Sequence, residues 1–168
     1  MPALELAPFV YEGLTLRPWQ RGDLDRLAAL VTDREVMARA GGALRHDEVA
    51  GLLDRYLRAD DPRVVVALCV SGAGGAHVGS GQLVRPDEGE DAIELGYLVH
   101  PAHQGRGHAT RIARALVQVA RAHFPGAELL ATVHAEHAAS IRVLEKAGLQ
   151  LARRTRGDEG EQLVYRAR

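Results

Sequence analysis

The stretch from residue 93 to residue 133 constrains the fold of this 168-residue chain most strongly, because the spacing of its apolar side chains changes twice. Residues 93–99 form a mostly apolar run that ends at Pro101, which is typical of a buried strand. Residues 107–124 switch to a helical period and stop at Pro125 and Gly126. Residues 129–133 return to a strand pattern. A strand, a helix and a second strand in this order predict an α/β domain.

Further strands and helices are predicted around this unit. Strands are expected at residues 14–16, 63–70, 78–84, 149–153 and 162–166, and helices at residues 24–31, 49–57 and 141–147. Asp23 is expected to cap the first of these helices. Loops are expected at residues 86–91 and 157–160. The predicted fold class is α/β, a mixed and mostly antiparallel sheet flanked by helices, and residues 1–168 are expected to form one domain.

Composition excludes several classes of protein. The 21 basic and 22 acidic residues leave a net charge of -1, so a general attraction to nucleic acid or to an anionic membrane is not indicated. The longest apolar run, residues 64–70, is far shorter than the roughly 20 residues needed to cross a bilayer. A single cysteine, Cys69, excludes an intrachain disulfide. The first residues lack a secretory pattern, so we expect a cytoplasmic protein, as a monomer or homodimer.

Residues 104–109, with the sequence Gln-Gly-Arg-Gly-His-Ala, connect the buried strand to the long helix. The first turn of a helix has backbone N–H groups without intrahelical partners, and its dipole favours negative charge. Small residues at positions 105, 107 and 109 would let an anion approach these groups. The segment predicts a phosphate or pyrophosphate site, with Arg106 and Arg111 as additional donors. The alternative is a tight turn whose glycines serve only steric needs.

The same segment matches the Gln/Arg-x-x-Gly-x-Gly/Ala signature of the GNAT superfamily of N-acetyltransferases, which binds the pyrophosphate of coenzyme A. Residues 14–19, 94–101 and 138–148 further resemble the branch that acetylates the N-termini of ribosomal proteins. The resemblance implies the GNAT fold and direct transfer of acetyl from acetyl-CoA to a primary amine. A protein N-terminal amine is the expected acceptor, and a polyamine, an aminoglycoside or an amino acid are alternatives. A non-catalytic coenzyme A sensor and a nucleotide-binding regulatory domain are the alternatives to an enzyme.

The resemblance also implies roles for single residues. Glu94 matches the carboxylate base that removes the proton of the amine, and its alternative is a carboxylate that only satisfies neighbours in the sheet. Ser140 matches a serine that hydrogen-bonds the leaving sulfur, and its alternative is a residue at the start of a helix. Leu144 stands where many members have a tyrosine acid. His137 replaces an asparagine that contacts pantetheine.

The expected binding residues follow from the same resemblance, and the N–H of Val99 is expected to polarise the thioester carbonyl. The residues expected to bind acetyl-CoA are Leu98, Val99, His100, Gln104, Gly105, Arg106, Gly107, His108, Ala109, Thr110, His137 and Ser140. The residues expected to line the acceptor site are Trp19, Arg34, Glu35, Met37, Arg39 and Tyr97. Core packing is the alternative for Trp19. No metal is expected, because His100, His103 and His108 have no known ligand spacing.

Overall fold

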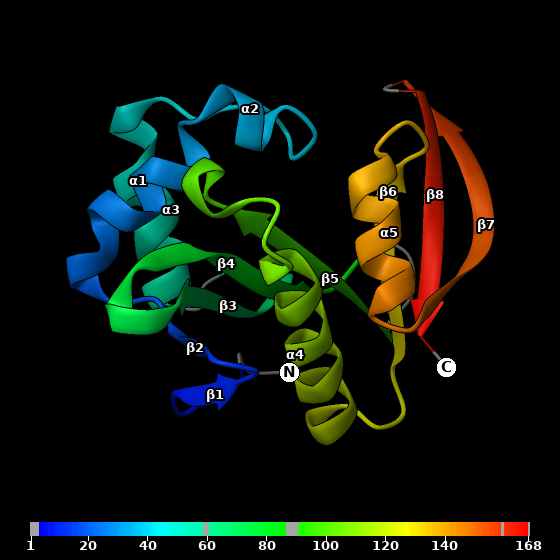
Figure 1. Ribbon diagram of the computed structural model, residues 1–168, viewed down its shortest axis with the longest axis horizontal. Helices are drawn as coiled ribbons and strands as arrows, with labels where there is room; N and C mark the ends of the chain where they lie inside the picture. Colours follow the sequence, from blue (N-terminus) through cyan, green and yellow to red (C-terminus); the bar gives the residue numbers. More distant parts are fainter. Residues whose placement is uncertain (1–3, 59–60, 87–90, 159, 168) are drawn as a thin grey trace.

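One mixed sheet organises the fold. The computed structural model describes residues 4–58, 61–86, 91–158 and 160–167. Within these residues eight strands form a sheet of order β1-β2-β3-β4-β5-β6-β8-β7 (Figure 1). The strands are β1 Phe9–Tyr11, β2 Leu14–Pro18, β3 Val64–Ser71, β4 His77–Val84, β5 Ala92–Val99, β6 Glu128–His134, β7 Leu149–Gly157 and β8 Gly160–Ala167. Only β5 and β6 pair in parallel, and the other neighbouring described strands pair antiparallel. The predicted fold class is confirmed.

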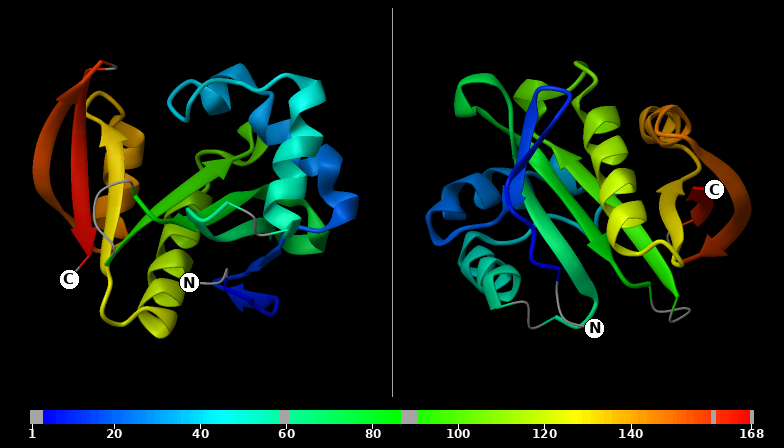
Figure 2. Two further views of the ribbon diagram at one scale, coloured as in Figure 1. Left: turned by 180° about the vertical axis from the view of Figure 1, so that it is seen from behind. Right: turned by 90° about the horizontal axis from the view of Figure 1, so that it is seen from below.

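Helices cover both faces of the sheet (Figure 2). They are α1 Leu24–Val31, α2 Arg34–Met37, α3 His46–Arg58, α4 His108–His123 and α5 Ala138–Lys146, with single-turn helices η1 Arg21–Asp23, η2 Ala73–Gly75 and η3 Pro101–His103. Helices α4 and α5 lie on one face, and α1 and α3 pack on the other. None of the helices in the described part of the chain has both the length and the apolar character of a membrane-crossing segment.

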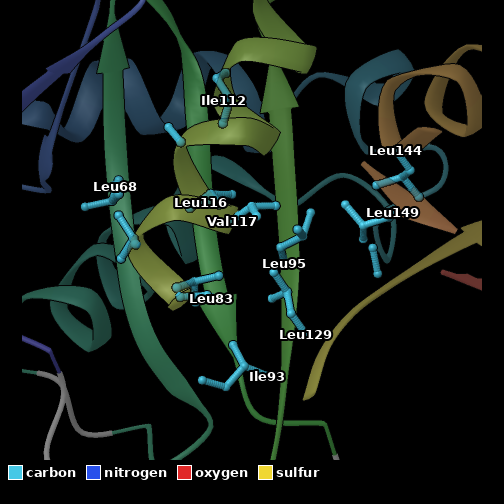
Figure 3. Close-up of a cluster of buried hydrophobic side chains, with 14 of the residues drawn as sticks. Leu68, Leu83, Ile93, Leu95, Ile112, Leu116, Val117, Leu129, Leu144 and Leu149 are labelled. Carbon is cyan, nitrogen blue, oxygen red and sulfur yellow. The ribbon is translucent and has the colours of Figure 1, made fainter. Parts of the chain in front are cut away.

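The two faces bury separate cores. The larger core lies between α4, α5 and the sheet, and Figure 3 shows Leu83 and Leu95 of the sheet beside Leu116 of α4. A Cβ on Gly81 would lie only 3.0 Å from Ile112 Cγ2, so this glycine allows the close approach of α4. The second core joins α1, α2 and α3 to the opposite face of the sheet through Trp19, Leu27, Leu30, Val31, Met37, Val49, Leu53 and Cys69.

Several local details differ from the sequence-based prediction. Strand β1 and helix α2 were not predicted, because three- and four-residue elements are too short to show a period. Strands β7 and β8 extend beyond the predicted hairpin, to Gly157 and from Gly160. Residues 87–90 of the predicted loop, and Glu159 of the predicted closing turn, lie outside the described residues.

The predicted capping role of Asp23 is wrong. Its carboxylate makes no cap to α1 and instead accepts two hydrogen bonds from the Arg17 guanidinium, at 2.6 and 2.8 Å. It also accepts the backbone N–H of Gln20 at 2.8 Å. Asp23 is buried, so a charged partner satisfies it better than a helix N-terminus open to solvent would.

Candidate active site

Strands β5 and β6 separate partway along their length. Their parallel pairing covers Ala92, Ile93 and Glu94 on β5, opposite residues 128–130 of β6. Strand β4 continues to pair with β5 as far as Val99. Beyond Glu94, the edge of β5 that faces β6 therefore opens, and the left view of Figure 2 shows the green strand β5 and the yellow strand β6 diverging.

The register of β4 and β5 determines which backbone groups face this opening. His100 donates its N–H to the carbonyl of Val78 at 2.8 Å, so these residues form a hydrogen-bonded pair. Hydrogen-bonded and non-hydrogen-bonded pairs alternate along an antiparallel ladder, which directs the N–H groups of residues 95, 97 and 99 to the open edge. The Val99 N–H thus faces the opening. The backbone groups of Leu98 and His100 face β4 instead, which corrects their expected role in binding acetyl-CoA.

The side chains of β5 alternate between the two faces of the sheet. Leu95 and Tyr97 pack with the larger core on the α4 face, whereas Leu98 packs with the second core. By the same alternation the half-buried Glu94 lies on the face covered by α1 and α3. Tyr97, predicted to line the acceptor site, therefore lies on the face opposite to Glu94.

Gly96 leaves room for the side chain of Gln82. A Cβ at Gly96 would lie 3.2 Å from the Nε2 atom of Gln82, its cross-strand partner. The amide of Gln82 therefore borders the same part of the face as Glu94 and Gly96. Sequence reasoning missed Gln82, although the alternation within residues 78–84 indicated an outward polar side chain.

The turn between β5 and α4 depends on two glycines in the left-handed region. Gly105 has a φ of 72° and Gly107 a φ of 76°, both positive values that strain other residues. A Cβ at either position would meet no atom within 4 Å, so conformation and not crowding requires glycine. The Gln104 side chain donates to the carbonyl of Val99 at 3.1 Å and ties this turn to the end of β5.

The backbone N–H groups of this turn are available to a ligand. Helix α4 begins at His108, and Gly107 before it has no side chain to cap the helix. The first helical bond runs from the Arg111 N–H to the Gly107 carbonyl at 3.2 Å. None of the N–H groups of residues 105–110 has a hydrogen-bond acceptor among the described residues. A row of open amides at a helix N-terminus fits a pyrophosphate group.

Arg111 has a different role from the one predicted. Its guanidinium donates to the carbonyl of Glu12 at 3.0 Å and to the carbonyl of Arg106 at 3.3 Å. It also lies 2.9 Å from Nδ1 of His108, and burial together with the Arg111 charge lowers the pKa of His108. Arg111 therefore anchors the turn to the β1–β2 hairpin. The exposed Arg106 remains the candidate cation at the turn.

The start of α5 brings two predicted residues to the opening. His137 immediately precedes the helix, and burial, followed by the charge of Arg39, lowers its pKa. The ring of His137 is therefore neutral at neutral pH, with one donor and one acceptor nitrogen. Ser140 lies in the first turn of α5, and its Oγ is 2.6 Å from the hydroxyl oxygen of Tyr97.

Two of the expected acceptor contacts lie in the core. Trp19 is 5% exposed and stacks on Tyr56 with ring centroids 6.5 Å apart, and Met37 is 8% exposed. Both side chains fill the second core, which agrees with the alternative given for Trp19 and corrects the predicted place of Met37 in the acceptor site. Glu35 is exposed on α2, and Arg39 follows in the segment that extends towards α5 (Figure 1).

The histidines near the turn pack against one another. The rings of His100 and His103, and those of His103 and His108, meet edge to face with centroids 6.0 Å apart. Within the described ranges, no group of three or more His, Cys, Asp or Glu side chains could hold a metal ion. His100 Nδ1 instead accepts the N–H of Ala102 at 3.2 Å.

Comparison with known proteins identifies the family. Residues 13–150 match the family model of the acetyltransferase (GNAT) domain, and the chain belongs to this family. It is 31% identical over 148 residues to mycothiol acetyltransferase from Streptomyces coelicolor, which covers 84% of this chain and 46% of that protein. The chain thus spans about half the length of the curated relative it matches.

Solved structures share the fold. A GNAT-family acetyltransferase from Bacillus anthracis superposes with a TM-score of 0.81 at 19% identity, over 95% of this chain and 97% of that one. Spermidine N-acetyltransferase from Vibrio cholerae, in complex with CoA and spermine, superposes with a TM-score of 0.76 at 21% identity, over 92% and 93%. The family match confirms the predicted superfamily, and the solved structures confirm its fold. None of them names the ribosomal-protein branch, which stays a prediction.

Proposed function

We propose that this domain transfers the acetyl group of acetyl-CoA to a primary amine by direct attack in a ternary complex. One observation carries the proposal: the open amides of residues 105–110 follow, after the short helix η3, the strand whose free edge faces the opening between β5 and β6. A long thioester can therefore be held at its pyrophosphate end while its other end lies along β5. The CoA complex of the similar Vibrio cholerae spermidine N-acetyltransferase supports acetyl-CoA as the acetyl donor.

The donor site uses backbone groups. The pyrophosphate would accept hydrogen bonds from the amides of residues 105–110, with Arg106 as an additional cation. The pantetheine arm would follow the open edge of β5, where the Val99 N–H would donate to the thioester carbonyl. A hydrogen-bond donor that is fixed in place before the reaction typically lowers the barrier by about 3 kcal/mol, because the protein need not reorganise as the oxyanion develops.

Glu94 would act as the base. A primary alkylammonium with a pKa of about 10.4 is neutral in only about one molecule in a few thousand at pH 7, and only the neutral amine attacks. Glu94 lies where β5 and β6 part, on the face opposite the larger core. It would accept the proton of the amine, directly or through water, as the nitrogen attacks the carbonyl carbon. Collapse of the tetrahedral intermediate then breaks the C–S bond.

The acceptor would enter on the Glu94 face, bordered by Gly96, Gln82 and the segment after α2. Arg39 is close enough to His137 for its charge to lower the histidine pKa, so one positive charge lies at this rim. The resemblance supports a peptide N-terminal amine as the acceptor. The spermine complex of the Vibrio cholerae neighbour supports a polyamine as the second candidate.

A mass-shift screen tests the proposal. The protein would be incubated with acetyl-CoA and separate acceptors: peptides that begin with Ala or Ser, spermine, an aminoglycoside and a free amino acid. We expect one acetyl group on at least one acceptor, and calorimetry should show binding of acetyl-CoA and CoA in preference to ATP. Binding of acetyl-CoA with no acetylation of any acceptor would instead favour a sensor. Preferential binding of ATP would favour a nucleotide-binding regulatory domain.

A further inference from the structure

A pair of hydroxyl groups joins β5 to α5, the helix that follows β6. The Tyr97 hydroxyl oxygen and Ser140 Oγ are 2.6 Å apart, although 43 positions separate them in sequence. Tyr97 belongs to β5, and Ser140 belongs to α5, the helix that follows β6. Both residues are half-buried, so neither is sealed inside the core.

The position of Tyr97 on β5 relates this pair to the proposed reaction. Tyr97 lies two residues before Val99, and both side chains pack with the larger core, whereas Glu94 is on the opposite face. A thioester held against the Val99 N–H would therefore have Glu94 on one side of β5 and Tyr97 on the other. The base that would act on the attacking amine and the hydroxyl pair that would act on the leaving sulfur therefore lie on different sides of β5.

The leaving thiolate needs a proton, and Tyr97 is suited to provide it. Leu144 follows Ser140 by one helical turn, is 2% exposed in the larger core and has no proton to give (Figure 3). Burial raises the pKa of Tyr97, so the phenol is protonated at neutral pH. A phenol is also a far stronger acid than the aliphatic hydroxyl of Ser140.

We propose that Tyr97 donates the proton to the sulfur of the leaving CoA and that Ser140 is a positioning residue that holds the phenol. As the C–S bond breaks, its electron pair goes to sulfur, the Tyr97 O–H bond breaks and an S–H bond forms. Ser140 donates a hydrogen bond to the resulting phenolate, which regains a proton from solvent. Glu94 releases to solvent the proton taken from the amine. This inference rests on the proposed acetyl transfer.

Three single variants and one double variant test the inference. Tyr97→Phe should lower kcat by about 10²-fold, with the acetyl-CoA dissociation constant changed by less than about threefold. Ser140→Ala should lower kcat by about 10-fold, and Ser140→Thr, which keeps a hydroxyl, should restore it. The double variant that combines Tyr97→Phe with Ser140→Ala should be no slower than Tyr97→Phe alone, because both changes remove the same step.

Tyr165→Phe is the matched control. Tyr165 is also buried, and its hydroxyl donates to Glu145 of α5 at 3.3 Å, outside the opening. We expect wild-type kcat from this variant. Turnover by the wild type is measured first: its absence with every amine would contradict the proposed function itself. An active wild type together with full kcat in Tyr97→Phe, or with a loss only in acetyl-CoA binding, would overturn the role of Tyr97 and leave the acetyl transfer standing.

Discussion

Replacement of Gly79 by alanine should separate β4 from β5 beside the candidate active site. Gly79 pairs with Val99, and an added Cβ would lie 2.1 Å from the carbonyl oxygen of Leu98 and 3.1 Å from the Cα of Val99. Both contacts are backbone atoms, which cannot rotate away as a flexible side chain could. A carbon and a carbonyl oxygen need about 3.3 Å, so the strands must move apart by about 1 Å.

The cost follows from what this movement disturbs. It strains the hydrogen bond from the His100 N–H to the Val78 carbonyl, now 2.8 Å, whose loss costs about 1 kcal/mol. Overpacking adds about 1–3 kcal/mol. We therefore expect Gly79→Ala to lower the free energy of unfolding by about 2–4 kcal/mol and Tm by about 5–15 °C for a chain of this size. Acetyl transfer should also slow, because the Val99 N–H moves with β5.

Thermal and urea unfolding measure the first effect, and the rate of thiol release from acetyl-CoA measures the second. Gly126→Ala is the control, since a Cβ there meets nothing within 4 Å. A Gly79→Ala protein as stable as this control would refute the close approach of the two backbones. A stable variant with normal turnover would also refute the placement of the Val99 N–H.

Three further predictions follow from single groups. Glu94→Gln should lower kcat by about 10²-fold or more with little change in acetyl-CoA affinity, and full turnover across the pH range would remove Glu94 from the role of base. Hydrogen bonding by Arg17 lowers the pKa of Asp23, so the ion pair stabilises the fold above the ordinary pKa of about 3.9 and loses its effect as the pH falls through the lower native value. Asp23→Asn should thus lower the free energy of unfolding by about 2–3 kcal/mol at pH 7. This is less than the loss expected for a fully buried pair, because Arg17 is partly exposed. In urea unfolding, the difference between this variant and the wild type should narrow towards pH 3. Burial raises the pKa of the Cys69 thiol, so a thiol reagent should label it only after unfolding, and rapid labelling of the native protein would contradict its place in the core.

The long elements were predictable because their apolar patterns extend over many residues. Helix α4 shows a one-sided apolar stripe, and β3, which is buried on both faces, shows one continuous apolar run. Asp23 shows where this reasoning fails. A cap is a local interaction, whereas the observed partner, Arg17, lies on the preceding strand and reaches Asp23 only because η1 turns the chain back.

The candidate site was predictable where its chemistry is local. The glycines at 105 and 107 and the helix start at His108 are adjacent in sequence, and their spacing alone indicates open amides. The bond from Arg111 to the carbonyl of Glu12 joins residues 99 positions apart, and only the assembled sheet places them together. The Tyr97–Ser140 pair depends in the same way on how α5 packs beside β5.

The assignment of Glu94 and Tyr97 to opposite faces of β5 depends on the packing of Gly81 on the neighbouring strand β4. A register shift of one residue between β4 and β5 would exchange the faces of the strand and place Glu94 against the larger core. Gly81 pairs with Tyr97, and α4 lies so close above it that a Cβ would be 3.0 Å from Ile112. Because Gly81 is flanked by Ser80 and Gln82, a slip of β4 would place a larger side chain under α4, where there is no room for it. The contact of α4 with Gly81 therefore selects the register, and the register in turn separates the proposed base from the proposed proton donor.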